Sequence, residues 1–150
     1  MLAIWPSRAA DEKRPGAPNA RQTEGSSSRR PAPGKRRVLV IEDNLDTVRS
    51  LALLLRDMGH EVEYAINGYA GLEVARRFAP DVIILDLGLP GMDGFDVCRR
   101  IKRDPELSSV RVIALTGYAQ EDYRERALKA GCEQHFVKPI DAGTLEKILQ

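Results

Sequence analysis

Polar side chains follow several apolar runs of this sequence, and their types together could perform phosphoryl chemistry. The runs end at an acidic pair, a single aspartate, a threonine and a lysine, namely Glu42 and Asp43, Asp86, Thr116 and Lys138. Converging carboxylates repel one another, by about 4 kcal/mol for a pair 4 Å apart at an effective dielectric constant of about 20. A cation must balance them, and Lys138 supplies only one positive charge.

The three carboxylates therefore favour a hard divalent cation. Magnesium suits a site with few carboxylates, because it retains several waters and then takes a phosphate oxygen. A carboxylate beside such an ion can attack phosphorus and form an aspartyl phosphate, while an ammonium and a hydroxyl contact the remaining oxygens. Gly88 and Gly117 leave space beside Asp86 and Thr116 for a phosphodonor. Each residue alone has an ordinary structural explanation, such as a helix cap, and only their joint placement indicates a site.

The spacing of apolar residues shows which elements must position this chemistry. Apolar residues predict strands at 38–41, 82–85 and 110–115, and the alternating residues 62–65 predict a shorter, more exposed strand. A fifth strand is predicted at 134–137. Between them, apolar residues recur with the period of a helix, which predicts five helices. Asn44 and Asp141 are predicted to cap two of these helices, and Asn67-Gly68 to form a turn. Alternating strands and helices with doubly buried strands indicate an α/β fold, a parallel sheet with helices on both faces and a site beyond the strands' carboxyl ends.

Residues 1–37 differ from this domain in composition. They contain five prolines, three glycines and the run Ser26-Ser27-Ser28, without apolar periodicity, which predicts a disordered tail. They hold nine basic and three acidic residues, a net charge of +6, whereas residues 38–150 carry −5 and the whole chain +1. The basic tail could contact an acidic partner, nucleic acid or anionic lipid, or could only increase solubility.

Several classes of protein are disfavoured by the composition. No apolar run approaches the roughly 20 residues of a membrane helix, and the N-terminus does not resemble a secretory signal, so a cytoplasmic location is expected. Cys98 and Cys132 lie far apart in the sequence and have no C-x-x-C spacing. This argues against a disulfide scaffold, a zinc site and a redox motif.

Four stretches of the sequence resemble the receiver domain of bacterial two-component response regulators, including receivers associated with hybrid histidine kinases. They are VLVIEDN (38–44), DVIILDLGLPGMDG (81–94), VIALTGYA (112–119) and HFVKPID (135–141). The resemblance implies a flavodoxin-like (βα)5 fold over residues 38–150, with strand order 2-1-3-4-5. It also implies a phosphorelay module, which is not an enzyme beyond catalysing its own phosphorylation and dephosphorylation.

The same resemblance assigns roles to the residues at the strand ends. It implies that Asp86 is the phosphoacceptor, that Thr116 is the switch hydroxyl and that Lys138 pairs with the phosphoryl group. The metal is Mg²⁺, with Mn²⁺ as a substitute, held by Asp43, Asp86 and the backbone carbonyl of Gly88. Glu42 acts on the metal largely through water. A cis bond between Lys138 and Pro139 is also implied.

His135 departs from the family's usual pattern, which has tyrosine or phenylalanine at this position. It is either a switch ring with a different polarity and pH response, or an exposed residue of an edge strand. Phe136 cannot replace it, because consecutive side chains of a strand point to opposite faces.

The resemblance further implies a sensor or hybrid histidine kinase as phosphodonor and an unidentified downstream protein. A weak dimer through the last two helices and the strand between them is also expected. No DNA-binding module fits after residue 150, so the sequence is either a stand-alone receiver or a piece of a longer protein.

Two other classes fit the residues less well. A phosphatase of the haloacid dehalogenase type needs a second acid where this chain has Gly88, and it also needs a cap domain. A flavodoxin-like cofactor binder needs a Ser/Thr/Gly-rich loop where this chain has Glu-Asp-Asn-Leu-Asp.

Overall fold

The computed structural model describes residues 34–117 and 121–150. The chain divides into two units, residues 1–31 and 32–150, and all that follows concerns the second. The predicted tail lies almost entirely outside the described residues. Only its last residues fall inside them, and there the first strand begins at Arg37, one residue before the expected boundary.

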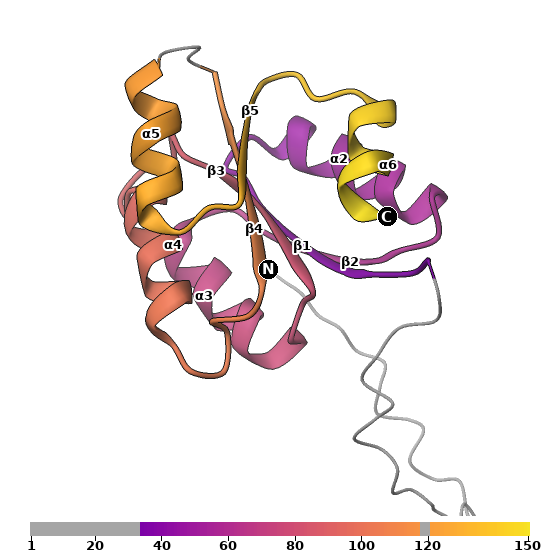
Figure 1. Ribbon diagram of the computed structural model, residues 1–150. Coiled ribbons are helices and arrows are strands. Elements are labelled where there is room, and N and C mark those ends of the chain that lie inside the picture. The colour runs from indigo at the N-terminus through magenta and orange to yellow at the C-terminus, as the bar shows by residue number, and fades with distance from the viewer. Residues whose placement is uncertain (1–33, 118–120) are drawn as a thin grey trace, which may run out of the picture. The chain divides into compact units, whose positions relative to one another are not determined.

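Five parallel strands form one sheet, as the sequence predicts (Figure 1). They are β1 (Arg37–Ile41), β2 (Glu61–Ala65), β3 (Val82–Asp86), β4 (Arg111–Thr116) and β5 (Gln134–Val137). Their order is β2-β1-β3-β4-β5, which confirms the flavodoxin-like topology. All strands being parallel, their carboxyl ends meet at one edge of the sheet.

Five helices cover the two faces of the sheet. They are α2 (Leu45–Asp57), α3 (Gly68–Phe78), α4 (Gly94–Arg103), α5 (Glu121–Ala130) and α6 (Ala142–Leu149). Helices α3, α4 and α5 pack on one face, and α2 and α6 pack on the other (Figure 1). Side chains alternate between these layers along each strand, so that Ile83 and Leu85 face α4 while Val82 and Ile84 face α2. None of these helices has the length and apolar character of a transmembrane span.

Helix caps fix where the chain leaves each strand. The predicted caps are confirmed, because the side chain of Asn44 accepts a hydrogen bond from the Thr47 N–H and that of Asp141 accepts one from the Thr144 N–H. Asn67 is not simply a turn residue, since its side chain caps α3. Asparagine favours turns and N-caps for the same reason, its short side chain bonding nearby backbone groups.

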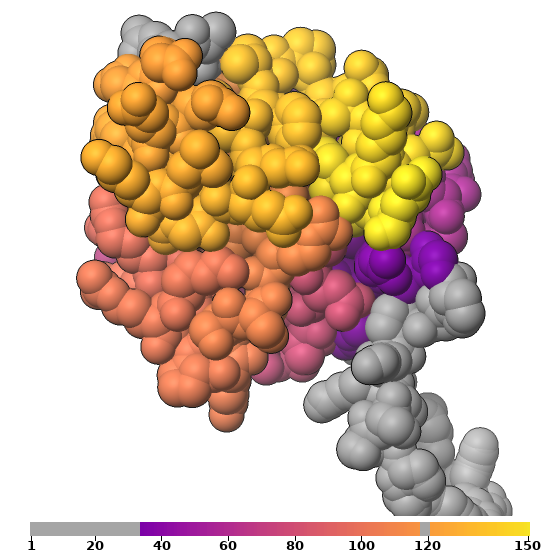
Figure 2. Space-filling view, in the orientation of Figure 1, coloured from indigo at the N-terminus to yellow at the C-terminus, as the bar shows by residue number. Residues whose placement is uncertain are grey.

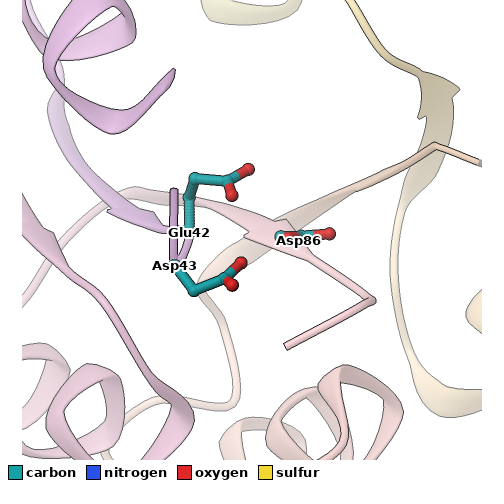
Figure 3. Close-up of side chains that lie close together, drawn as sticks. All are labelled: Glu42, Asp43 and Asp86. Carbon is teal, nitrogen blue, oxygen red and sulfur yellow. The ribbon is translucent and has the colours of Figure 1, made fainter. Parts of the chain in front are cut away.

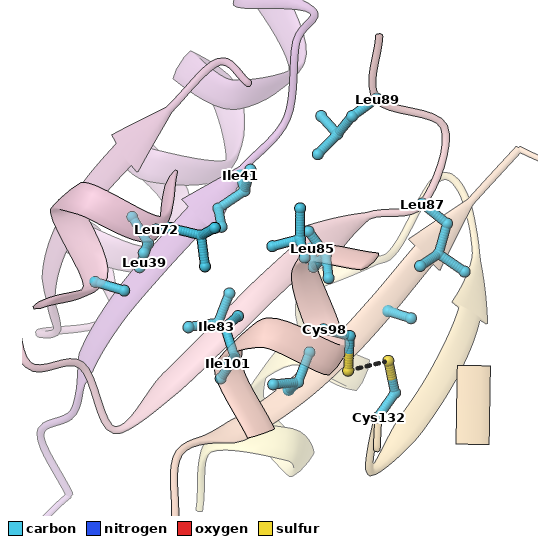
Figure 4. Packing of buried hydrophobic residues seen from close by; sticks show 14 of the residues in the cluster. Leu39, Ile41, Leu72, Ile83, Leu85, Leu87, Leu89, Cys98, Ile101 and Cys132 are labelled. Carbon is cyan, nitrogen blue, oxygen red and sulfur yellow. Dashed lines mark hydrogen bonds between the residues drawn. The ribbon is translucent and has the colours of Figure 1, made fainter. Parts of the chain in front are cut away.

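The core between the sheet and α3–α5 contains both cysteines (Figure 4). Cys98 lies in α4 and Cys132 follows α5, and their sulfur atoms are 3.2 Å apart. Both are free thiols and buried. The two thiols are far apart in the sequence, but the packing of α5 against α4 brings them into contact.

Candidate functional site

Three carboxylates meet at the carboxyl edge of the sheet (Figure 3). Glu42 and Asp43 directly follow β1, and Asp86 is the last residue of β3. Because β1 and β3 are neighbours in the sheet, one oxygen from each side chain lies within 4.8 Å of the other two. Glu42 and Asp86 are buried, whereas Asp43 is exposed. The strand ends that the sequence singles out thus do converge.

Lys138 supplies the positive charge of the cluster. It directly follows β5, and its Nζ lies 2.7 Å from Glu42 Oε1 and 3.3 Å from Asp86 Oδ2. The peptide bond between Lys138 and Pro139 is cis, as expected. The lysine therefore bridges the two buried carboxylates.

Backbone N–H groups orient the other oxygens of these two carboxylates. The Gly88 N–H donates to Asp86 Oδ1 at 2.9 Å, and the Asn44 N–H donates to Glu42 Oε2 at 3.0 Å. Each buried carboxylate is thus held between the ammonium and a backbone donor. Such hydrogen bonds to ionised groups are the stronger kind in proteins.

In Glu42 and in Lys138, burial shifts the pKa toward the neutral form, while the opposite charge of the neighbouring group shifts it toward the ionised form. Burial raises the pKa of Glu42, and the hydrogen bonds from Lys138 and Asn44 offset only part of that rise. Burial also acts to lower the pKa of Lys138, but the hydrogen bond to Glu42 and the charge of Asp86 outweigh it and leave that pKa raised. The lysine is therefore held firmly in its charged form, one positive charge among three acidic groups.

The glycines near Asp86 have unequal roles. A Cβ at Gly88 would lie 3.6 Å from Asp86 Oδ1, an ordinary contact beside the acceptor, and one at Gly117 would meet no atom within 4 Å. A Cβ at Gly94 would lie 2.5 Å from the Leu87 Cα and 2.7 Å from the Asp86 carbonyl oxygen. Gly94 therefore lets α4 start directly against the end of β3. The sequence analysis missed this residue, although its place after the cap Asp93 is a recognisable pattern of a helix start.

The two expected switch residues lie on neighbouring strands. Thr116 ends β4 and is buried, and His135 pairs with Ala114 of the same strand. Ala114 faces the α3–α5 side, so alternation puts Thr116 and His135 on that side as well. Phe136 packs on the opposite side, as predicted.

His135 is half-buried rather than fully exposed. Its Nε2 is buried and has no hydrogen-bond partner among the described residues. Burial lowers the pKa of the imidazole, and the positive charge of Arg124 lowers it further. The ring therefore favours its neutral form in this position.

Comparison with known proteins agrees with this geometry. The family profile of the response regulator receiver domain matches residues 38–150. The chain belongs to this family. Its receiver domain is 34% identical over 113 residues to the protein PilH of Pseudomonas aeruginosa, covering 75% of this chain and 93% of PilH. It is 39% identical over 105 residues to the response regulator PleD of Caulobacter vibrioides, covering 70% of this chain but only 23% of that longer protein.

A solved structure of similar fold contains a metal ion. The receiver domain of the sensor histidine kinase PA1611 from Pseudomonas aeruginosa is 32% identical, with a TM-score of 0.71, and the match covers 77% of this chain and 95% of that one. That structure has a magnesium ion coordinated in its active-site cleft. The acidic cluster of the present chain offers oxygen ligands from Glu42, Asp43 and Asp86, the donor type that a hard divalent cation requires. The residues present thus fit such an ion.

Proposed function

We propose that this chain acts in the cytoplasm as a phosphorelay receiver that accepts a phosphoryl group on Asp86. The donor is the phosphohistidine of a sensor or hybrid histidine kinase, and the reaction depends on Mg²⁺. The observation that carries the proposal is the bridge from Lys138 to both Glu42 and Asp86 inside a cluster of three carboxylates. The ammonium of Lys138 thus lies where a phosphoryl group on Asp86 would need a positive charge beside one of its oxygens.

The residues of the chain divide the work of the transfer. A carboxylate oxygen of Asp86 bonds to phosphorus while the bond from phosphorus to the donor's imidazole nitrogen breaks. The Gly88 N–H fixes the carboxylate through Oδ1, and Lys138, 3.3 Å from Oδ2, is close enough to turn to a phosphoryl oxygen. Asp43, Asp86 and the Gly88 carbonyl would hold Mg²⁺, with Glu42 acting through water, and the bound ion would supply positive charge opposite the phosphoryl oxygens.

A groove beside Lys138 gives the phosphodonor a place to dock. It has a volume of about 360 Å³ and lies between α2 and the segment that joins β5 to α6. Ser50, Leu54 and Ile140 contribute to its lining, so polar and apolar groups both face the opening. A helical domain that carries the phosphohistidine could contact this groove while its imidazole approaches Asp86.

The phosphorylated state is signalled through Thr116 and His135. The phosphoryl group adds up to two negative charges and strong acceptor oxygens at the end of β3. These draw the Thr116 hydroxyl toward Asp86 and open space on the α5 side of β4. The His135 ring, which faces that side beside the small Ala114, then moves into the space.

The change reaches the surface formed by α5, β5 and α6, the segments that cover much of the face in Figure 2. Leu128 and Val137 are exposed apolar residues of this surface. We place the contact with the downstream protein, and a weak dimer, on this surface. Beryllofluoride, a stable phosphoryl mimic, should shift the amide resonances of Thr116, His135 and α5. Shifts confined to residues that adjoin Asp86 would show that signalling uses another surface.

Phosphorylation itself is tested by incubation with acetyl phosphate and Mg²⁺, followed by measurement of the intact mass. The parent should gain one phosphoryl group, and Asp86→Asn should gain none. Asp57→Asn, which removes an exposed carboxylate at the end of α2, is the matched control and should behave as the parent. Labelling of Asp86→Asn at the parent's level would show that the acceptor is another residue.

A further inference from the structure

Two thiols that play no part in the phosphorelay site lie in direct contact inside the protein (Figure 4). The Cys132 thiol donates to Cys98 Sγ over 3.2 Å, and the Cys98 thiol in turn donates to the Ala130 carbonyl oxygen over 3.4 Å. Both cysteines are free thiols. The contact is therefore a paired dithiol with no role in the site described above.

The fold holds this pair in place through the end of α5. Gly131 has a φ of +112°, and the Cys132 N–H donates to the Ala127 carbonyl oxygen at 3.0 Å. This hydrogen bond and the left-handed glycine reverse the chain and turn Cys132 toward α4. Lys102 of α4 packs on Gly131, where a Cβ would lie 2.6 Å from the lysine Cγ. The approach of the sulfur atoms is thus set by the turn at the end of α5 and by the packing of Lys102 of α4 against that turn.

We propose that Cys98 and Cys132 form a redox-sensitive modification site, in which hydrogen peroxide converts the two thiols to an intramolecular disulfide. The disulfide would tie the middle of α4 to the end of α5.

The reaction balances in two steps. The Cys98 thiolate attacks peroxide, an S–O bond forms, the O–O bond breaks, and the hydroxide that leaves takes up the proton lost by the thiol, giving a sulfenic acid and water. The Cys132 sulfur then attacks the Cys98 sulfur, so that the S–S bond forms, the S–O bond breaks and a second water leaves. Two thiols are oxidised and one peroxide is reduced to two waters.

The surroundings divide these two roles between the thiols. The hydrogen bond from Cys132 lowers the pKa of Cys98, against the effect of burial, and the positive charges of Lys102 and Arg99 lower it further. The same hydrogen bond raises the pKa of Cys132, and burial adds to that rise. Cys98 is therefore the thiol that ionises first, and Cys132 is the one that resolves the sulfenic acid.

Buried thiols react only when the structure opens locally, so the path of the oxidant matters. The buried residues of α5 are the small Ala127 and Ala130, and Tyr123 is half-buried against Phe95. Helix α4 buries more and larger side chains, namely Phe95, Val97 and Ile101. Elements with few buried apolar contacts open more readily than the rest of a domain. Detachment of α5 from α4 admits a molecule as small as peroxide, and its return places the two sulfur atoms together.

The experiment uses the full-length reduced protein under native conditions. After exposure to peroxide and removal of the oxidant, the protein is unfolded in guanidinium chloride so that every free thiol is accessible to iodoacetamide, and the intact mass and a non-reducing peptide map are measured. The proposal expects the loss of two hydrogen atoms, no alkylation at either cysteine, one cross-linked peptide pair that contains Cys98 and Cys132, and reversal by dithiothreitol. Full alkylation of both residues, or cross-links only between separate chains, would overturn it.

Single serine variants separate the roles of the two thiols. Cys132→Ser should accumulate a Cys98 sulfenic acid that dimedone traps, and Cys98→Ser should be labelled far more slowly. Equal trapping in both variants would overturn the assigned order. Should either variant fail to fold, the peptide map of the parent still decides whether the disulfide forms.

Hydrogen exchange gives a second and independent measurement on the parent protein. The disulfide closes the segment from Cys98 to Cys132, which includes β4 and α5. Amide exchange in α5 should become slower after oxidation, while exchange in α2, on the other face of the sheet, stays unchanged. Faster exchange in α5 would show that the cross-link distorts the fold instead of joining residues already in place.

Discussion

Replacing Asp86 by asparagine should change the free energy of unfolding in a direction that depends on the metal. Oxygens of Glu42, Asp43 and Asp86 lie within 4.8 Å of one another, where each charged pair repels by about 3.5 kcal/mol at an effective dielectric constant of about 20. The variant loses two such repulsions. It also loses the attraction between Lys138 and Asp86 at 3.3 Å, about 5 kcal/mol on the same scale.

Without divalent cations, the variant should therefore be more stable than the parent, by about 2 kcal/mol on this scale. Because Asp43 is exposed, water screens its share of the repulsion and reduces the difference. With Mg²⁺ the order should reverse. A ligand at 100 times its dissociation constant stabilises the folded state by about 2.7 kcal/mol, and a site that lacks the Asp86 charge gains less.

Urea unfolding followed by circular dichroism measures both effects. The parent, Asp86→Asn and the control Asp57→Asn are compared at low ionic strength, first with EDTA and then with rising Mg²⁺. The curves of the parent and Asp86→Asn should cross, whereas the control should follow the parent throughout. A variant that is less stable than the parent in EDTA, or one that gains as much from Mg²⁺, would refute the electrostatic reasoning.

Three further predictions concern the frame of the site, the second histidine and the tail. Gly94→Ala should destabilise the domain by about 1–3 kcal/mol and slow labelling by acetyl phosphate, while Gly117→Ala, which adds a methyl group in open space, should leave the free energy of unfolding unchanged. Burial, followed by the charges of Arg36 and Lys35, lowers the pKa of His60, so its contribution to stability is complete above about pH 6.5 and is lost as the pH falls through the lowered value. His60→Gln should therefore flatten the fall in the free energy of unfolding between about pH 7.5 and 5, and an unchanged slope would exclude this role. Deletion of residues 1–33, which hold six basic and three acidic groups, changes the net charge from +1 to −2 and should leave melting temperature and phosphorylation unchanged.

The order of the elements could be predicted because β1, β3 and β4 are apolar runs and β2 alternates polar and apolar residues. The run 82–85 is buried at every position, and the fifth strand occupies the predicted residues 134–137. The ends of the elements were harder to place. Arg37 joins β1 because its N–H donates to the Asp81 carboxylate and its guanidinium stacks on Phe78, contacts with residues more than forty positions away. No local pattern contains that information.

The site was predictable to a similar extent and for a similar reason. In a parallel sheet, residues at the ends of neighbouring strands must meet, which brings Glu42, Asp43 and Asp86 together whatever their separation in sequence. No comparable rule predicts from sequence which residues of two packed helices come into contact. The approach of Cys132 to Cys98 depends on how α5 settles on α4, and the close packing at Gly94 depends on where α4 starts. The contact of the two thiols therefore has no signal in the sequence, whereas the start of α4 at Gly94 has a local one, the cap residue Asp93.

Lys138 contacts both buried carboxylates of the cluster. One ammonium faces three acidic groups, and it lies closer to Glu42, at 2.7 Å, than to Asp86, at 3.3 Å. Burial raises the pKa of Glu42, and the nearby ammonium of Lys138 opposes that rise and favours the ionised carboxylate. A bound dication would take over the balancing of the carboxylates, and Lys138 would then be free to leave Oδ2 for a phosphoryl oxygen. Lys138→Met should therefore weaken the phosphorylated state more than it weakens Mg²⁺ binding, since removing a cation relieves competition at the metal site while depriving the phosphoryl group of its partner.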